Sequence, residues 1–381
     1  MSLQVLHLIG GGEIGGAEHN VLNLLTGFPR DKVNPFLGCL VKNSPLAALT
    51  SSKRICTEIF PMRFPLDILP VIPLIRFCRN NKIGLIHCHG VRANLIGRIT
   101  ARLLSIPAIS TVHSLPEYDY PSSWKGKFAL LLDNKTLSLS SGIITVSDNL
   151  RVAVSQRIKS RTRDLPIKTI YNGIPWLDFA NQEVMRTEFR HKWNIPQEKT
   201  VIGTIGRLHP VKGQIYLAEA MELLIKEYPH LHLLIIGEGP IRPQLQDLLA
   251  SNKLPYTMTG YLPSAWKALP AMDIFLLPSL SEGMGLVLLE AAQAKIPIIA
   301  SNTGGIPELF AGEREILLCK PADPLDLTLA CSRILENDDL AKTLVQNAYQ
   351  RAMKFTVDKM VNDTTDFYLE ITKASMSYYS S

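Results

Sequence analysis

The chain has 381 residues, of which 46% are hydrophobic and 19% are charged, and its formal net charge is +6. This length suits two domains of ordinary size, and the composition excludes a disordered chain. No run of 18 uncharged apolar residues occurs, so the sequence predicts no transmembrane helix.

Short apolar runs alternate with segments of helical period along the whole chain. The first run, residues 3–9, has no basic region before it and is too short for a secretory signal, so we expect a strand there. Further predicted strands are residues 36–41, 84–89, 108–113, 142–147, 167–173, 201–207, 231–237, 256–261, 274–279 and 296–301. Helical segments such as 17–25 and 243–250 lie between them. This β-α-β alternation, present twice, predicts two doubly wound, Rossmann-like α/β domains with parallel sheets.

A polar stretch, residues 180–199, separates the two halves and places a domain boundary near Asp178. We therefore expect a first domain over 1–178 and a second over 179–355. The apolar spacing of residues 356–373 predicts a C-terminal helix that packs back on the first domain. In such a pair of domains, ligands are expected in a central cleft lined by the carboxyl ends of the strands.

A glycine-rich loop, residues 9–20, follows the first strand and contains the pattern G-x-G-x-x-G in Gly10, Gly12 and Gly15. The pattern is typical of NAD sites, but such sites also need an acidic residue after the second strand. Lys42 and Asn43 stand there instead, which disfavours an oxidoreductase. The glycines still allow a ligand to approach the backbone, and a helix beginning at Gly16 attracts anions. A turn without any ligand is the alternative.

Two cations follow the first strand of the second domain. Arg207 and Lys212 lie five residues apart at the carboxyl edge of the predicted sheet. An Arg fork and a Lys ammonium together can neutralise a diphosphate. Ordinary surface cations are the alternative.

Two glutamates frame a second loop of the same domain. Glu282 precedes the pair Gly283 and Gly285, and Glu290 lies about two turns into the following helix. A carboxylate at Glu290, among leucines, is costly unless hydroxyl groups such as those of a ribose donate to it. The alternatives are a salt bridge at the edge of the core for Glu290 and a solvated acid for Glu282.

The ordered set of motifs resembles the retaining glycosyltransferases of family 4, the group 1 transferases, which have the GT-B fold. The resemblance covers nearly the whole chain and is carried by GGAE at 15–18, HCHG at 87–90, TVHS at 111–114, TVS at 145–147, YNGI at 171–174, GRLHPVKG at 206–213, IIGEGP at 235–240, GYL at 260–262, E-x7-E at 282–290 and TGGIPEL at 303–309. Three positions depart from the family pattern: Lys295, Gly84-Leu85, and Met284 in place of an aromatic residue.

The resemblance implies a role for each candidate residue of the second domain. Arg207 and Lys212 hold the donor diphosphate, and Glu290 binds the nucleotide ribose. Glu282, taken as catalytic, contacts the donor sugar together with the backbone amides of Met284, Gly285 and Leu286.

From the first domain, the resemblance implies that Gly16 closes on the phosphates and that His113 reaches the donor sugar. We interpret His113 as a residue that positions or polarises the sugar rather than as a general base. His87 and His89 are interpreted as structural residues at a strand end, because H-C-H spacing alone does not make a metal site.

The activity implied is transfer of a sugar from a nucleotide diphosphate sugar, a UDP-sugar in our reading, to an acceptor hydroxyl, in the synthesis of bacterial cell-surface polysaccharide or glycolipid. No Asp-x-Asp motif occurs, so we expect neither a metal nor another cofactor. Three alternatives stay open: a nucleotide-sugar epimerase, a phosphorylase, and a non-catalytic relative that binds nucleotide sugars.

The charge distribution bears on the acceptor. Residues 1–175 carry 21 Lys+Arg and 10 Asp+Glu, whereas the remainder carries 19 and 24. This basic half, together with Phe60, Met62, Phe64, Leu66 and Trp124, suits a glycan or lipid-linked acceptor and peripheral contact with an anionic membrane. Nucleic acid binding fits the charge alone and is not expected. Six scattered cysteines without a C-x-x-C pair predict reduced thiols in the cytoplasm. From the basic half we expect association with the inner face of the membrane.

Overall fold

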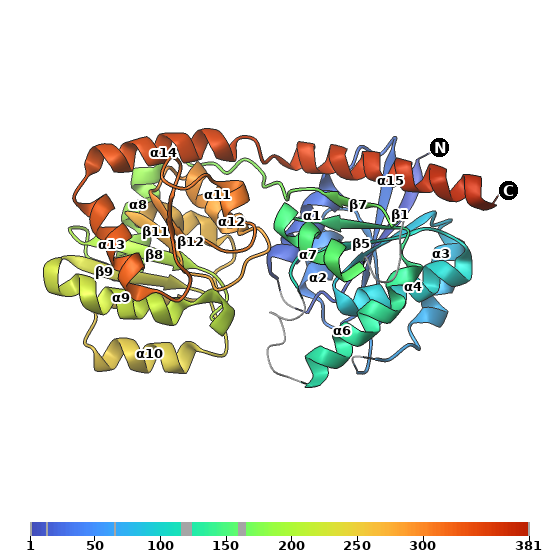
Figure 1. Cartoon of the computed structure of the whole chain (residues 1–381), viewed down its shortest axis with the longest axis horizontal. Coiled ribbons are helices and arrows are strands. Elements are labelled where there is room, and N and C mark those ends of the chain that lie inside the picture. The colour runs from blue at the N-terminus through green and yellow to red at the C-terminus, as the bar shows by residue number, and fades with distance from the viewer. Residues whose placement is uncertain (1, 13, 65, 116–123, 159–164, 380–381) are drawn as a thin grey trace. The chain divides into compact units, whose positions relative to one another are not determined.

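The computed structural model describes residues 2–12, 14–64, 66–115, 124–158 and 165–379. The chain forms two compact units (Figure 1), Met1–Pro175 with Phe355–Ser381, and Trp176–Lys354. The sequence placed the boundaries after residues 178 and 355. In each unit the strands form one parallel sheet, as the alternation of strands and helices predicted.

The first unit has a seven-stranded sheet in the order β3-β2-β1-β4-β5-β6-β7. Its strands are β1 (Leu3–Ile9), β2 (Val33–Cys39), β3 (Cys56–Ile59), β4 (Leu85–His89), β5 (Ala108–Val112), β6 (Gly142–Thr145) and β7 (Ile167–Thr169). Its helices are α1 (Gly16–Gly27), α2 (Pro45–Ser51), α3 (Val71–Asn80), α4 (Val91–Leu104), α6 (Trp124–Thr136), the short η1 (Leu137–Leu139), α7 (Asp148–Ile158) and α15 (Val357–Tyr379).

The two faces of this sheet are covered differently because side chains alternate along each strand. On one face, Leu6 and Leu8 of β1 pack with Leu74 of α3 and Ile96 of α4. On the other face, residues of β1, β4, β5 and β6 pack against Phe367, Tyr368 and Ile371 of α15. The C-terminal helix thus completes the core of the first unit (Figure 1).

The second unit has a six-stranded sheet in the order β10-β9-β8-β11-β12-β13. Its strands are β8 (Thr200–Ile205), β9 (Leu231–Ile236), β10 (Tyr256–Gly260), β11 (Ile274–Leu277), β12 (Ile298–Ser301) and β13 (Leu317–Cys319). Its helices are α8 (Gln182–Lys192), η2 (Pro210–Lys212), α9 (Gln214–Glu227), α10 (Arg242–Ser251), η3 (Ala265–Ala271), α11 (Leu286–Gln293), α12 (Ile306–Leu309), α13 (Pro324–Leu335) and α14 (Asp338–Ala352).

Two strands were not predicted from the sequence, β3 and β13. Both are short, and both lie at an edge of their sheet. An edge strand needs no continuous apolar run because one side lacks a covering neighbour, and β3 has mostly exposed side chains. β3 therefore lacks the apolar signal of the other strands, whereas β13 is apolar but only three residues long.

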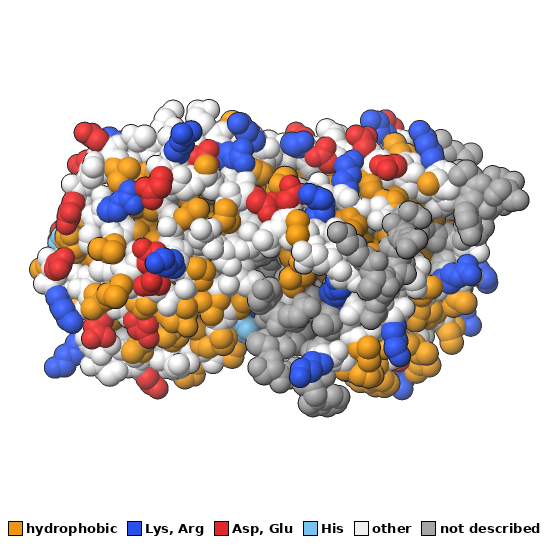
Figure 2. Space-filling model, viewed as in Figure 1, with side chains coloured by type: hydrophobic (Ala, Val, Ile, Leu, Met, Phe, Trp, Pro, Cys, Tyr) orange, Lys and Arg blue, Asp and Glu red, His pale blue; other side chains and the backbone are white. Residues whose placement is uncertain are grey.

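The surface of the first unit bears on the predicted membrane contact. Phe60 is buried in the core, which corrects its reading as a surface residue, whereas Phe64, Ile68 and Ile72 are exposed. The side chain of Trp124 lies outside the described residues. Hydrophobic and basic side chains are intermixed on the visible face of this unit (Figure 2). None of the helices in the described part of the chain has the length and apolar character needed to cross a membrane.

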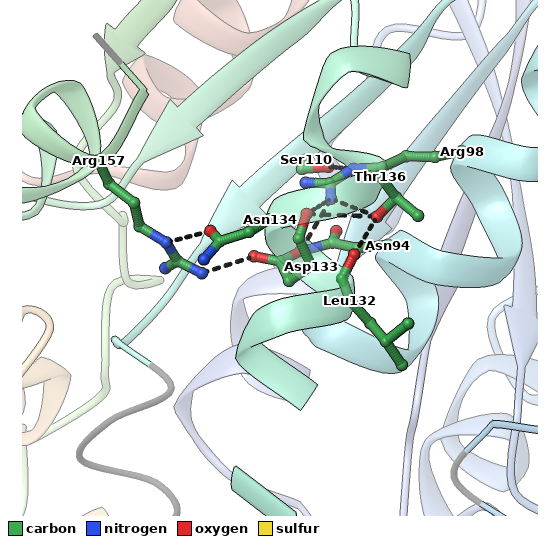
Figure 3. Close-up of polar contacts among 8 residues, drawn as sticks. All are labelled: Asn94, Arg98, Ser110, Leu132, Asp133, Asn134, Thr136 and Arg157. Atoms are coloured by element: carbon green, nitrogen blue, oxygen red, sulfur yellow. Dashed lines mark hydrogen bonds and ion pairs between the residues drawn. The ribbon is translucent and has the colours of Figure 1, made fainter. Parts of the chain in front are cut away.

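A buried ionic network holds α6 to its neighbours (Figure 3). The guanidinium of Arg98 in α4, only 1% exposed, pairs with Asp133 of α6 at 2.8 Å and donates to Ser110 of β5 at 3.2 Å. Arg157 of α7 reaches the other carboxylate oxygen of Asp133 at 3.4 Å. One carboxylate therefore joins three helices.

Candidate active site

The order of strands in the second unit reverses between β8 and β11. From β8 the chain builds outward through β9 and β10, and it then returns to place β11 on the other side of β8. In open parallel sheets, ligands bind outside the carboxyl ends of the strands at this switch point. The loop after β8 carries Arg207 and Lys212, and the loop after β11 carries Glu282 and leads into α11.

Close backbone contacts hold these loops together. The amide of Leu280 donates to the carbonyl of Val211 at 2.8 Å, which joins the loop after β11 to the loop after β8. Gly304 has a φ of +55°, and a Cβ atom there would lie 1.8 Å from the carbonyl oxygen of Glu282. Only glycine fits at this position, so the TGG segment at 303–305 supports the loop that carries Glu282.

Lys212 and Glu282 are paired with each other. The Lys212 ammonium lies 2.5 Å from Oε1 of Glu282, and the Ser279 hydroxyl donates to the same oxygen at 2.8 Å. The side chain of Glu282 is only 9% exposed. The structure therefore contradicts the alternative of a solvated acid, and the pair places one cation and one carboxylate at the switch point.

Glu290 is the opposite case. Its carboxylate has neither a hydrogen bond nor an ion pair with any side chain in the described ranges, so the alternative of a salt bridge is not observed. Burial raises its pKa to about 7. The carboxylate is thus poised to accept hydrogen bonds from hydroxyl groups of a ligand, because these would offset the cost of desolvation.

The start of α11 supplies backbone donors. Gly285, with a φ of +79°, precedes the first helical residue, Leu286, and first-turn amides have no partner within a helix. The side chain of Met284 is 3% exposed. The departure from the family pattern at Met284 therefore falls on a buried residue beneath the loop. Arg207 is exposed at the end of β8.

In the first unit, α1 begins at Gly16 as predicted, and Glu18 accepts a hydrogen bond from the Gly15 amide at 3.1 Å. A Cβ atom at Gly16 would meet nothing within 4 Å, so the space beside it is open. In the preceding loop, the glycine that needs a positive φ is Gly11.

His113 follows β5 and contacts a group of buried histidines. Its Nε2 lies 3.1 Å from Nδ1 of His89, and burial lowers the pKa of His113 to about 4. His7 and His87 are paired in register on the adjacent strands β1 and β4. No role was predicted for His7 or for Tyr368, whose hydroxyl contacts the rings of His7 and His87. The available signal was a histidine in the first predicted strand and two histidines at alternate positions of the strand over residues 84–89, which lies beside it in the sheet.

Known proteins resemble this chain over most of its length. Two family models match the chain in succession: Glycosyltransferase Family 4 over residues 14–175 and Glycosyl transferases group 1 over residues 185–351. A putative teichuronic acid biosynthesis glycosyltransferase of Bacillus subtilis is 27% identical over 77% of this chain and 72% of its own. A UDP-Gal:alpha-D-GlcNAc-diphosphoundecaprenol alpha-1,3-galactosyltransferase of Escherichia coli is 24% identical over 80% of both chains.

Solved structures share the fold over the full length. HepE of Anabaena, in complex with UDP-glucose, has a TM-score of 0.82 at 20% identity and covers 97% of this chain and 100% of its own. Sucrose-phosphate synthase of Thermosynechococcus elongatus has a TM-score of 0.80 at 20% identity, with the same coverage. The family models, the relatives and the two parallel sheets together show that this chain belongs to the group 1, family 4 glycosyltransferases.

Proposed function

We propose that the protein transfers a hexose from a UDP-sugar to a hydroxyl group of an acceptor, with retention of the anomeric configuration. The observation that carries this proposal is the carboxylate of Glu290 on α11, which has no partner among the described residues. Helix α11 begins beside the loop that holds the Lys212–Glu282 pair. A nucleotide diphosphate sugar offers what such a site needs: ribose hydroxyls for the carboxylate and a diphosphate for the cations.

In this proposal, Arg207 and Lys212 bind the diphosphate and stabilise the charge that develops as it leaves. The first-turn amides of α11 and Glu282 contact the donor sugar, and a leaving phosphate oxygen takes up the acceptor proton. Charges and dipoles held in place before the reaction are the main source of rate enhancement in such sites. His113 and Gly16 contribute from the first unit, and neither a metal nor another cofactor is included.

The names of the relatives support a UDP-sugar as the donor and a lipid-linked or glycan molecule as the acceptor. The Escherichia coli relative is named for UDP-Gal and a lipid diphosphate, the Bacillus subtilis relative for teichuronic acid, and HepE was solved with UDP-glucose. We propose a lipid-linked or glycan acceptor on the first unit, in cell-surface polysaccharide or glycolipid synthesis at the cytoplasmic face of the membrane.

Donor affinity tests the site. Calorimetric titration with UDP-glucose, UDP-galactose, GDP-mannose and ADP-glucose identifies the nucleotide, and Arg207→Ala and Glu290→Ala are each expected to weaken binding about tenfold or more. Arg333→Ala, on an exposed ion pair of the same unit, serves as the control and should leave the affinity unchanged. Wild-type affinity in both site variants would contradict the assignment.

Glu282→Ala is expected to lower turnover more than donor affinity, since its contact is with the sugar. Anomeric NMR of the product checks retention, and an assay with EDTA checks metal independence. An epimerised donor without transfer would favour the epimerase, and donor binding without turnover on any acceptor would favour a non-catalytic relative.

A further inference from the structure

An unbroken row of hydrogen bonds runs through the first unit from Tyr368 of α15 through His7 and His89 to His113, and we call this row the file. The Tyr368 hydroxyl lies 3.4 Å from Nε2 of His7, and Nδ1 of His7 lies 3.2 Å from Nε2 of His89. Nδ1 of His89 in turn lies 3.1 Å from Nε2 of His113. His7, His89 and Tyr368 are buried, so water does not interrupt the file.

A second branch leaves the same hydroxyl. Tyr368 Oη lies 2.5 Å from Nδ1 of His87, and Nε2 of His87 lies 2.6 Å from the Thr111 hydroxyl. The Tyr368 hydroxyl therefore joins the two branches. Because it has one proton and two imidazole neighbours, it can donate to only one of them.

All four rings are neutral at pH 7. Burial lowers the pKa of His7 to about 3 and that of His113 to about 4, and it lowers the pKa values of His87 and His89 well below their usual range. A neutral imidazole donates from one nitrogen and accepts at the other. The direction of one hydrogen bond in the file therefore determines the direction of all the others.

Two arrangements satisfy every bond. If Tyr368 donates to His87, then His7, His89 and His113 each carry the proton on Nε2, and Nδ1 of His113 is an acceptor. If Tyr368 donates to His7, the order reverses and Nδ1 of His113 is a donor. The shorter contact is to His87, and a phenol is a stronger donor than a neutral imidazole N–H, so the first arrangement is favoured.

We infer that Tyr368 is a positioning residue that sets the tautomer of His113 through His7 and His89. Nδ1 of His113 has no partner within the described part of the chain, so it is the nitrogen left for a ligand. Under the proposed function, on which this reading of the ligand rests, Nδ1 accepts a hydrogen bond from a hydroxyl of the donor sugar. With the proton on Nδ1, the imidazole would instead donate to that hydroxyl, so the hydroxyl proton would have to point to another acceptor.

A metal is the competing explanation, since ligand atoms of His7, His87 and His89 lie within 4.8 Å of one another. Every ring nitrogen of these three residues, however, already has a hydrogen-bond partner in the file or its branch. A bound ion would need to break several of these bonds, so we favour protons over a metal.

The test is long-range 1H–15N NMR of the full chain labelled with 15N-histidine, which shows the protonated nitrogen of each ring. In the wild type we expect His113 to be protonated on Nε2. Tyr368→Phe should shift the His113 proton towards Nδ1, because Nε2 of His7 loses its partner and an orphaned acceptor there costs less than an orphaned N–H. Thr111→Val should reverse the order and move the His113 proton to Nδ1, because an orphaned N–H on His87 is costlier than an orphaned acceptor.

Phe28→Leu is the matched control, because the Phe28 ring packs 5.7 Å from His7 and 5.8 Å from Tyr368 but makes no bond in the file. It should disturb packing and keep the tautomers. An unchanged His113 tautomer in both Tyr368→Phe and Thr111→Val would overturn the inference. So would a spectrum at pH 7 in which both nitrogens of a ring are protonated, or stoichiometric zinc in the purified protein.

Kinetics separate this inference from the proposed function. Tyr368→Phe is expected to lower kcat about tenfold with UDP affinity within twofold, since one hydrogen bond to the sugar is affected. The NMR result needs no substrate, so absence of sugar transfer would contradict the proposed function alone. If the enzyme transfers sugar but the His113 tautomer is the same in the wild type and in both file variants, only the role of Tyr368 is contradicted.

Discussion

Two glutamates of the second unit lie in opposite electrostatic environments. Glu282 is paired with Lys212, whereas Glu290 has no described partner and its pKa is raised to about 7 by burial. The spacing of the two glutamates predicted their importance. It could not predict the pairing, because Lys212 and Glu282 are 70 residues apart and meet only when β8 and β11 become neighbours.

Donor binding should depend on the ionisation of Glu290. Hydroxyl donors favour the carboxylate form, so affinity for UDP-glucose should rise as the pH rises from 6 to 8, about tenfold for a group with a pKa near 7. Isothermal titration at each pH measures this change, and Glu290→Gln should show weak binding with little pH dependence. A flat profile in the wild type would argue against ribose binding by Glu290.

Loss of the Asp133 carboxylate should destabilise the first unit. Arg98 is 1% exposed, so Asp133→Ala leaves a buried guanidinium without its counter-charge (Figure 3). We expect the free energy of unfolding in urea to fall by about 3–5 kcal/mol. Glu313→Ala, which breaks the exposed pair with Arg333, should cost less than about 1 kcal/mol. An equal loss of unfolding free energy in the two variants would contradict the conclusion that the buried ion pair stabilises the protein more than the exposed one.

At the scale of elements, the inner strands were predicted well, whereas two of the four edge strands, β3 and β13, were not. Residues 274–279 were predicted as a strand, and β11 occupies Ile274–Leu277. β3 was missed because an edge position tolerates a short strand with exposed side chains, and β13 because it is only three residues long. The supporting contact between the TGG segment and Glu282 was also beyond sequence reasoning, since it depends on the approach of two loops.

Gly304→Ala should disturb the loop that carries Glu282. Its φ is +55°, and a Cβ atom would lie 1.8 Å from the Glu282 carbonyl oxygen. We expect a loss of at least about 1–2 kcal/mol in the free energy of unfolding, because an L-residue is strained there, together with reduced turnover. Gly206→Ala, where a Cβ atom meets nothing within 4 Å, should be near neutral in urea denaturation. The interpretation fails if both variants unfold alike.

At the scale of the whole molecule, the two units differ in charge. The first unit carries 23 Lys+Arg and 14 Asp+Glu, a net charge of +9, and the second carries 17 and 20, a net charge of −3. The first unit also exposes Phe64, Ile68 and Ile72. Basic charge with exposed apolar side chains is the combination that holds a protein at an anionic membrane surface.

Binding to vesicles tests this surface. We expect the protein to sediment with phosphatidylglycerol vesicles at 50 mM salt and to be released at 500 mM, because salt screens the attraction. Ile68→Glu should weaken binding, while Leu325→Glu, an exposed apolar position on the acidic unit, should not. Failure to bind at low salt would contradict the membrane proposal.

The sequence by itself determined the fold class, the two sheets and the residues at their carboxyl ends, since hydrophobic period and turn residues are local properties. The tertiary structure decided which of those residues meet. It paired Lys212 with Glu282, left Glu290 without a partner among the described residues, and joined His7, His89 and His113 to Tyr368. These relations depend on strand order and on the packing of α15, which bring together residues up to 361 positions apart in the chain and leave no trace in local sequence.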